Sequence, residues 1–335
     1  MQNFFPEEAS LTGAHSGMLG ILNRFRISST LAGITMRSHL YINCRDITPI
    51  APFAKRRALL ASIALAALPL PLLAQSAPTP VFGTPGKDAG WIPTPAPMVE
   101  GMLRMAGVSK NDLVVDLGSG DGRIPIFAAK AFGARGLGIE LNGDLVAYSI
   151  EAAKKQGVAE RVRFVHGDIF EVDFNQGTVI SLFMPPQVNA RLLPKILAMR
   201  PGTRIVSYVF AMEDWEPDDW VFFDNVQGML WVVPARFEGN WRIRTEGPNP
   251  DSYEVTLTQR YQKINGHFMF GRAKLPLFDA NVLADRLRFT LVVGQRRFDF
   301  VGNHRGAALE GTLHVTGEPM RRWSAMKTGD VPRFP

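Results

Sequence analysis

Cysteine is almost missing from this chain, and histidine is scarce. Among 335 residues there are one cysteine, Cys44, and six histidines. A single cysteine excludes an intramolecular disulfide framework and a cysteine-rich metal cluster. The histidines are scattered without the spacing of a ligand set, so no metal site is predicted. No Gly-Lys-Ser/Thr follows the main glycine cluster, which excludes a P-loop nucleotide site.

A strong excess of positive charge is also missing from most of the chain. The formal net charge is +6, but residues 1–75 carry seven Lys/Arg and three acids, which leaves +2 for the remainder. So small a remainder gives no electrostatic footprint for nucleic acid. Nucleic acid is therefore not the expected partner.

An uncharged, mostly apolar run, Ala58 to Ala74, follows the basic tripeptide Lys55-Arg56-Arg57. A basic flank, an apolar centre and small residues at the end are typical of a secretory signal. We therefore expect export to the periplasm or cell envelope, and the twin arginine favours transport of a folded protein. The run has 17 residues, near the minimum span of a bilayer, so an uncleaved anchor is the one membrane contact expected. If the signal is not used, the protein stays in the cytoplasm.

The sequence divides into four segments by composition and pattern. These are an N-terminal extension with the signal peptide (1–75), a Pro- and Thr-rich linker (76–90), a first domain (91–236) and a β-rich second domain (237–330). In the first domain, strand-like and helix-like runs alternate, which predicts an α/β, Rossmann-like, mostly parallel sheet with helices on both faces. The expected strands are 112–117, 136–140, 161–166, 178–184 and 203–210, the expected helices are 94–106, 122–132, 144–156 and 186–200, and a closing hairpin is expected at 220–223 and 229–233.

The second domain contains short alternating runs separated by glycines, typical of a small antiparallel barrel or sandwich. Strands are expected at 240–244, 253–261, 267–273, 286–293, 296–301, 309–315 and 322–326. Its many aromatic residues form either a core or a face for a ligand or partner. They are Trp241, Tyr261, Phe268, Phe270, Phe289, Phe298, Phe300 and Trp323.

A glycine-rich turn is expected between the first strand and the next helix, in Asp116-Leu-Gly-Ser-Gly-Asp-Gly-Arg123. Glycine lets the chain bend tightly and approach a ligand closely. A helix start also favours an anionic group. The third glycine of the dinucleotide fingerprint would fall at Arg123, so the pattern is D-x-G-x-G-x-G instead. We expect a nucleotide-like cofactor of another kind.

Acidic residues follow the next two expected strands. Glu140 ends one, about 20 residues past the turn, where it can accept hydrogen bonds from ribose hydroxyls. Asp168 follows the other and can accept from an exocyclic amino group. In open α/β sheets ligands bind at the carboxyl ends of the strands, so the turn and both acids are expected at one site.

With these motifs the chain resembles the class I S-adenosylmethionine-dependent methyltransferases. The matching segments are V-D-L-G-S-G-D-G-R (115–123), G-I-E-L-N (138–142) and H-G-D-I-F (166–170). The lead-in W-I-P-T-P (91–95) and P-G-T-R-I-V-S (201–207) resemble a subgroup with archaeal and mitochondrial protein-lysine methyltransferases, and similar chains occur as exported bacterial proteins. The resemblance covers roughly residues 81 to 236.

The resemblance implies S-adenosylmethionine as the cofactor and a set of residues that hold it. Asp116 and the turn would hold its amino-acid end, Glu140 the ribose and Asp168 the adenine. The implied cofactor-binding residues are Thr94, Asp116, Gly118, Ser119, Gly120, Gly122, Glu140, Leu141, Asp168 and Ile169. Methyl transfer from a sulfonium needs positioning more than a protein nucleophile, so no catalytic residue is assigned outright.

Candidates for the acceptor side are Phe183 and Tyr208, as an aromatic wall or as plain sheet core, and Asn189. Met184 stands where methyltransferases of planar amides carry a polar residue, which argues against DNA adenine or glutamine as acceptor. Many related lysine methyltransferases have histidine where Tyr208 stands. The expected acceptor is an amine, such as that of a protein lysine. Two alternatives stay open: a non-catalytic envelope binding module, because the cofactor is made in the cytoplasm, and a small-molecule or lipid methyltransferase.

Overall fold

The computed structural model describes residues 40–41, 90–247 and 250–331. The expected signal segment, most of the linker and Cys44 lie outside these described residues. Two parts of the chain follow residue 90.

The first part is built on one mixed sheet with the strand order β1-β7-β8-β6-β5-β2-β3-β4. Neighbours among β6, β5, β2, β3 and β4 run parallel, whereas β8 runs antiparallel to both β6 and β7. This confirms the Rossmann-like sheet with its closing hairpin. The strands are β1 (Leu40–Tyr41), β2 (Leu113–Leu117), β3 (Arg135–Glu140), β4 (Val162–His166), β5 (Val179–Leu182), β6 (Arg204–Tyr208), β7 (Asp219–Phe223) and β8 (Val226–Val232).

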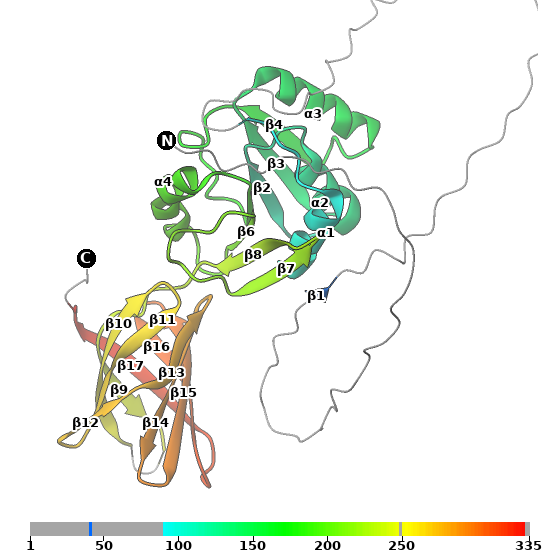
Figure 1. Ribbon diagram of the computed structural model, residues 1–335. Coiled ribbons are helices and arrows are strands. Elements are labelled where there is room, and N and C mark those ends of the chain that lie inside the picture. Colours follow the sequence, from blue (N-terminus) through cyan, green and yellow to red (C-terminus); the bar gives the residue numbers. More distant parts are fainter. Residues whose placement is uncertain (1–39, 42–89, 248–249, 332–335) are drawn as a thin grey trace, which may run out of the picture. The chain divides into compact units, whose positions relative to one another are not determined.

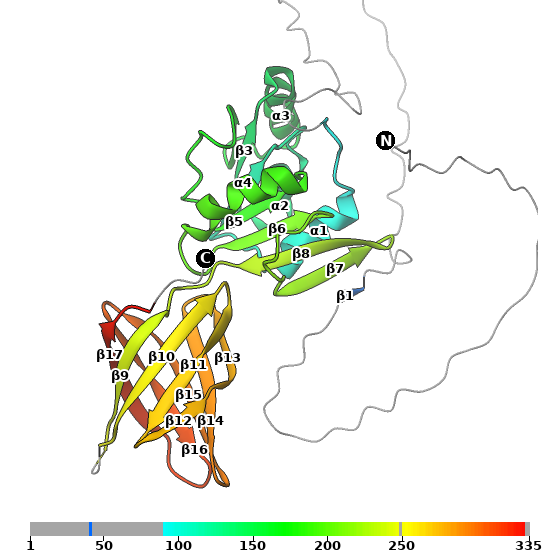
Figure 2. The ribbon, with the colours of Figure 1, turned by 60° about the vertical axis from the view of Figure 1, so that its left-hand side comes forward.

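Helices cover both faces of this sheet (Figures 1 and 2). The helices are α1 (Ala96–Met105), α2 (Arg123–Phe132), α3 (Gly143–Lys155) and α4 (Pro186–Leu197). Apolar residues at helical spacing bury one side of each: Met98 and Met102 of α1 pack in one core, and Leu192 and Ile196 of α4 pack in another. The expected layering is therefore confirmed.

Strand β6 is shorter than expected, because it ends at Tyr208 and not at residue 210. Val209 has a φ of 68°, and the Phe210 amide donates to the Tyr208 carbonyl at 2.8 Å. A β-branched residue with positive φ cannot be read from a hydrophobic pattern, and it takes the chain out of the sheet.

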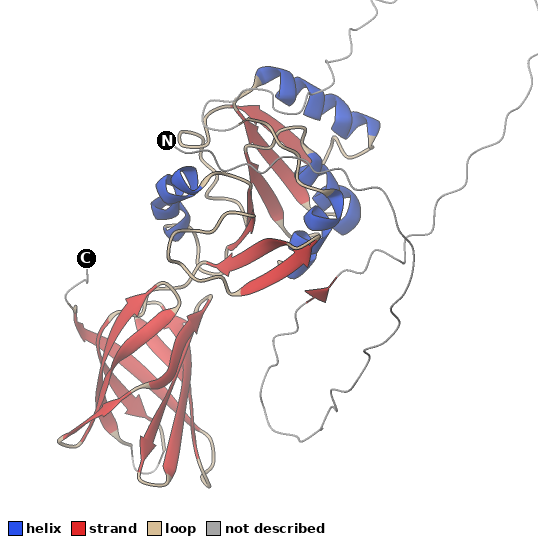
Figure 3. Cartoon of the chain, viewed as in Figure 1, coloured by secondary structure: helices blue, strands red, loops and turns tan. Residues whose placement is uncertain are grey.

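The second part is a closed antiparallel barrel of eight strands, which decides between the barrel and the sandwich. The order is β10-β9-β17-β16-β15-β14-β13-β11, and the additional pairing of β10 with β11 closes the ring. Figure 3 draws this part as strands and connecting loops. The strands are β9 (Gly239–Thr245), β10 (Ser252–Arg260), β11 (Lys263–Phe270), β13 (Phe278–Leu283), β14 (Arg286–Val293), β15 (Arg296–Arg305), β16 (Ala308–Val315) and β17 (Arg321–Gly329), with β12 (Ala273–Pro276) paired to β11 at the edge.

The expected strand 267–273 was wrong in extent, and two strands were missed. A turn at Gly271, whose φ is 63°, separates β11 from β12. Strand β13 is irregular: its register shifts between Phe278 and Asn281, and Asp279 has a φ of 50°. A bulge breaks the period of two on which strand prediction depends.

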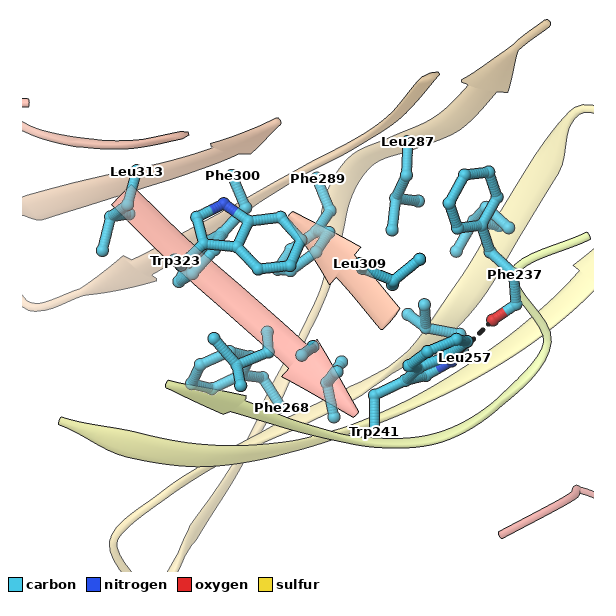
Figure 4. Packing of buried hydrophobic residues seen from close by; sticks show 14 of the residues in the cluster. Phe237, Trp241, Leu257, Phe268, Leu287, Phe289, Phe300, Leu309, Leu313 and Trp323 are labelled. Atoms are coloured by element: carbon cyan, nitrogen blue, oxygen red, sulfur yellow. Dashed lines mark hydrogen bonds between the residues drawn. The ribbon is translucent and has the colours of Figure 1, made fainter. Parts of the chain in front are cut away.

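Aromatic side chains fill the core of the barrel (Figure 4). Phe289 and Phe300 stack with their ring centroids 4.7 Å apart, and the Trp323 ring meets Phe300 edge-on. Six of the eight aromatics flagged in the sequence are at most 5% exposed, so the core interpretation is confirmed for Trp241, Phe268, Phe289, Phe298, Phe300 and Trp323.

Among the described residues, no helix has the length and apolar character required to cross a membrane. In the same ranges, no group of three His, Cys, Asp or Glu side chains is arranged to hold a metal ion.

Candidate active site

The carboxyl ends of β2, β3 and β4 meet at one edge of the sheet, because these strands are parallel neighbours. A cavity of about 280 Å³ opens there. It brings together most of the residues implied for the cofactor: Thr94, Asp116, Gly118, Ser119, Glu140, Leu141, Asp168 and Ile169. Gly120 and Gly122 shape the turn without lining the cavity.

All three glycines of the turn adopt positive φ, at 76°, 54° and 76° for Gly118, Gly120 and Gly122. The space around these residues also excludes a side chain. A Cβ at Gly118 would overlap the Met184 methyl group, and one at Gly120 would overlap the Trp91 indole. The first two glycines therefore make room for two side chains that line the cavity.

Glu140 is held by backbone amides. Its Oε2 accepts from the Gly120 amide at 2.8 Å, and its Oε1 accepts from the Asn142 amide at 2.9 Å. A carboxylate offers about four lone-pair sites, so two remain for ligand hydroxyls. Asn142 itself caps α3, because its side chain accepts from the Asp144 amide at 2.9 Å.

Asp116 is a buried acid, 4% exposed, at the end of β2. Burial raises the pKa of its carboxyl to about 8; the Ser181 hydroxyl opposes this shift, and the charges of Asp121 and Glu140 add to it. The nearest guanidinium, that of Arg123, is paired with Asp121 at 2.6 Å. A ligand ammonium at Asp116 would supply the positive charge that favours the ionised carboxylate.

The Asp168 carboxylate is oriented by the Phe170 amide, which donates to Oδ1 at 2.9 Å. Its neighbour His166 is exposed and does not line the cavity. The His166 Nε2 lies 2.8 Å from the Leu141 carbonyl, a structural contact between the end of β4 and the loop after β3. The site thus fits a nucleoside that carries an ammonium at one end and an amino-substituted base at the other.

Another part of the cavity lining, called the acceptor end below, is apolar and consists of Phe183, Met184, Pro185, Val188 and Phe210. The rings of Phe183 and Phe210 stack with their centroids 5.9 Å apart. This pair is called the aromatic wall below.

Of the three acceptor-side candidates, only Phe183 lines the cavity. Tyr208 packs edge-on against Phe183 at 4.8 Å, and Asn189 is fully buried behind the wall. Sequence reasoning missed Phe210, because it was placed inside a strand. Burial, aided by the nearby charge of Asp224, raises the pKa of Tyr208.

The strand-end acids, the glycine turn and this sheet define a class I S-adenosylmethionine-dependent methyltransferase. The sequence profile of the ANTKMT methyltransferase domain matches residues 116–219. The chain belongs to this family. It is 41% identical over 131 residues to a protein-lysine N-methyltransferase of Saccharolobus islandicus, over 38% of this chain and 81% of that protein.

Two more proteins are similar to this chain. The adenine nucleotide translocase lysine N-methyltransferase of Mus musculus is 38% identical over 31% of this chain and 46% of its own length. A solved structure described as an RNA methyltransferase from Salinibacter ruber, in complex with S-adenosyl-L-homocysteine, is 44% identical over 44% of this chain and 96% of that chain, with a TM-score of 0.43. The chain thus spans only about half the length of the mouse relative.

Proposed function

We propose that this methyltransferase transfers the methyl group of S-adenosylmethionine to an amine, with the side chain of a protein lysine as the first acceptor to test. The observation that carries the proposal is one cavity with two kinds of lining. The acidic groups of Asp116, Glu140 and Asp168 form one part of the lining, and apolar and aromatic side chains form another. The names of the archaeal and mouse relatives support lysine as the acceptor class.

The cofactor end is assigned residue by residue. The buried Asp116 takes the ammonium of the cofactor, Glu140 takes the ribose hydroxyls with its remaining lone pairs, and Asp168 takes the adenine amino group. Thr94, Leu141 and Ile169 supply the walls, and Ser119 lies in the turn. The Ser119 hydroxyl is buried and makes no hydrogen bond within the described protein.

The acceptor end acts through desolvation. The cofactor supplies an electrophilic methyl group and its own leaving group. The side chains of Phe183 and Phe210 exclude water from the incoming amine and favour its neutral form, which carries the lone pair that forms the new N–C bond. The aromatic faces then stabilise the positive charge that the nitrogen acquires.

RNA is disfavoured as the acceptor by the charge of the first part. Residues 90–234 contain 13 Lys and Arg against 17 Asp and Glu, a net charge of −4. A polyanion is repelled by such a surface. RNA, lipid and small amines are nevertheless included as arms of the acceptor test, since the Salinibacter relative is described as an RNA methyltransferase.

Asp168→Ala is expected to weaken S-adenosylmethionine binding about tenfold, because a hydrogen bond to a charged group is lost. Isothermal titration calorimetry measures the dissociation constant. The matched control is Asp173→Ala, an exposed acid after the same strand, which is expected to bind like the parent protein.

Transfer of a radiolabelled methyl group to lysine peptides, small amines, RNA, lipid vesicles and envelope extract identifies the acceptor. No cofactor binding by the parent protein would reject the proposal. Binding with no labelled product in any arm would favour the non-catalytic binding module.

We also propose export, on the basis of the basic and apolar segments between Lys55 and Ala74. Intact-mass measurement of the protein from fractionated native cells is expected to show a chain that begins shortly after Ala74, in the envelope fraction. A cytoplasmic protein that retains this segment would contradict the proposal.

A further inference from the structure

The chain makes a strained turn at the rim of the acceptor end. Val209 has a φ of 68° between Tyr208 and Phe210, and the Phe210 amide donates to the Tyr208 carbonyl at 2.8 Å. This closes a three-residue turn, the γ-turn of positive φ, which is rare and strained. Valine is unfavourable at the central position of such a turn, because a β-branched side chain is strained at positive φ. Such strain persists only where the surroundings impose it.

Three elements hold the turn in place. From β8, the Gln227 carbonyl accepts from the Val209 amide at 3.0 Å. From β6, the Ser207 hydroxyl donates to the Phe210 carbonyl at 2.7 Å. From α4, the Asn189 Nδ2 donates to the carbonyls of Ala211 at 3.1 Å and Phe210 at 3.4 Å.

The turn determines where Phe210 lies. If β6 continued, two residues of extended chain would carry position 210 about 7 Å past Tyr208 along the strand. The turn instead folds the chain back, so that Phe210 stacks on Phe183 and lines the cavity. The aromatic wall of the acceptor end therefore depends on the conformation of one residue, Val209.

The side-chain oxygen of Asn189 is buried without a hydrogen bond from any described residue, which is energetically unfavourable. Asn189 is fully buried on α4, and its Oδ1 has no hydrogen-bond partner among the described residues. An apolar residue of similar size would remove that unsatisfied acceptor. The Phe210 carbonyl would keep the Ser207 hydroxyl as a partner, and the Ala211 carbonyl belongs to an exposed residue.

We propose that Asn189 is a positioning residue that holds the strained turn at Val209, and thereby sets the Phe183–Phe210 wall against which the acceptor amine is methylated. The proposal rests on the proposed function for its consequence in catalysis, and on geometry alone for the placement of the wall. Asn189 does not touch the substrate. Its effect passes through the turn to Phe210.

Asn189→Leu is expected to let the turn at Val209 relax and to move Phe210 away from Phe183, without unfolding the protein. The dissociation constant of S-adenosylmethionine should stay within about twofold of the parent, because Asp116, Glu140 and Asp168 are untouched. With Nα-acetyl-lysine methylamide as the acceptor probe, kcat/KM should fall at least about tenfold, mainly through KM, since a small misplacement of a positioning surface is costly.

A second substitution separates positioning from general damage. Glycine adopts positive φ without strain. Val209→Gly in the Asn189→Leu background therefore lets the turn form without the hydrogen bonds from Asn189. It is expected to restore kcat/KM to within about threefold of the parent. Val209→Ala in the same background is the matched control and should not restore it, because alanine still resists positive φ.

A readout that needs no acceptor keeps this inference separate from the proposed function. Met184 lines the same cavity as Phe183 and Phe210, so its ¹³C-methyl resonance reports the ring currents of the wall. Met184→Leu assigns the peak. The peak is expected to shift in Asn189→Leu and to return with Val209→Gly but not with Val209→Ala. An unshifted peak, a joint loss of stability and cofactor binding, or equal behaviour of the glycine and alanine variants would overturn the proposal.

Discussion

Asp116→Asn is expected to weaken S-adenosylmethionine binding about 100-fold and, at the same time, to make the cofactor-free protein more stable at pH 8. The first effect follows because a buried carboxylate that meets an ammonium is a desolvated charge pair, worth several kcal/mol when one partner is truncated. The second follows because Asp116 is 4% exposed and burial raises the pKa of its carboxyl to about 8. Asparagine keeps the shape and removes the charge.

The pH dependence has a definite sign. In the unfolded chain this carboxyl titrates near 3.8, and in the folded protein it titrates near 8. Between these values the folded state binds the extra proton, so the contribution of Asp116 to stability is greatest at low pH and is lost as the pH rises through 8. The parent should lose up to about 1.4 kcal/mol of folding free energy per pH unit from this group across that window. Asp116→Asn should lack this slope.

Thermal unfolding between pH 5 and 9, without cofactor, measures the effect. The control is Asp144→Asn, an exposed acid in the first turn of α3, whose profile should follow that of the parent. Added cofactor should raise the melting temperature of the parent most at pH 8 and above and leave Asp116→Asn nearly unchanged. Parallel pH profiles for the parent and Asp116→Asn would show that the burial of this carboxyl has no energetic consequence.

The grouping of the strand-end acids was predictable because it follows a topological rule. Parallel strands place their carboxyl ends at one edge, so Asp116, Glu140 and Asp168 could be brought together from the sequence alone. The glycine turn was equally readable, since positive φ at three positions requires that residue type.

The acceptor end was only partly predictable, because it depends on departures from regular structure. Phe210 lines the cavity through the positive φ of Val209, which no periodicity reveals. Strand β13 was missed for a similar reason, because its bulge and the positive φ of Asp279 interrupt the alternation of apolar and polar residues. Chemistry at strand ends can be read from sequence, whereas side chains placed by local strain require coordinates.

Trp323→Ala is expected to produce the largest loss of stability, about 4 kcal/mol, because a buried indole is removed from a close-packed barrel core. Trp323 is 2% exposed on β17, its Nε1 donates to the Thr312 carbonyl at 3.0 Å, and its ring meets Phe300 at a centroid distance of 5.9 Å (Figure 4). Urea unfolding followed by circular dichroism measures the free energy of unfolding. Met326→Ala, on the same strand but 58% exposed, is the control and should cost under about 0.5 kcal/mol.

The size of this effect has a cause beyond burial. Gly302 of β15 lies opposite Gly311 of β16, and the Trp323 ring lies so close to Gly302 that a Cβ there would overlap it. Gly302 thus provides the space that the indole fills. Gly302→Ala should therefore destabilise the parent but cost markedly less in the Trp323→Ala background, a coupling of roughly 1–3 kcal/mol in a double-mutant cycle. Additive costs would mean that the indole and Gly302 are energetically independent, and that the barrel core tolerates rearrangement at this point.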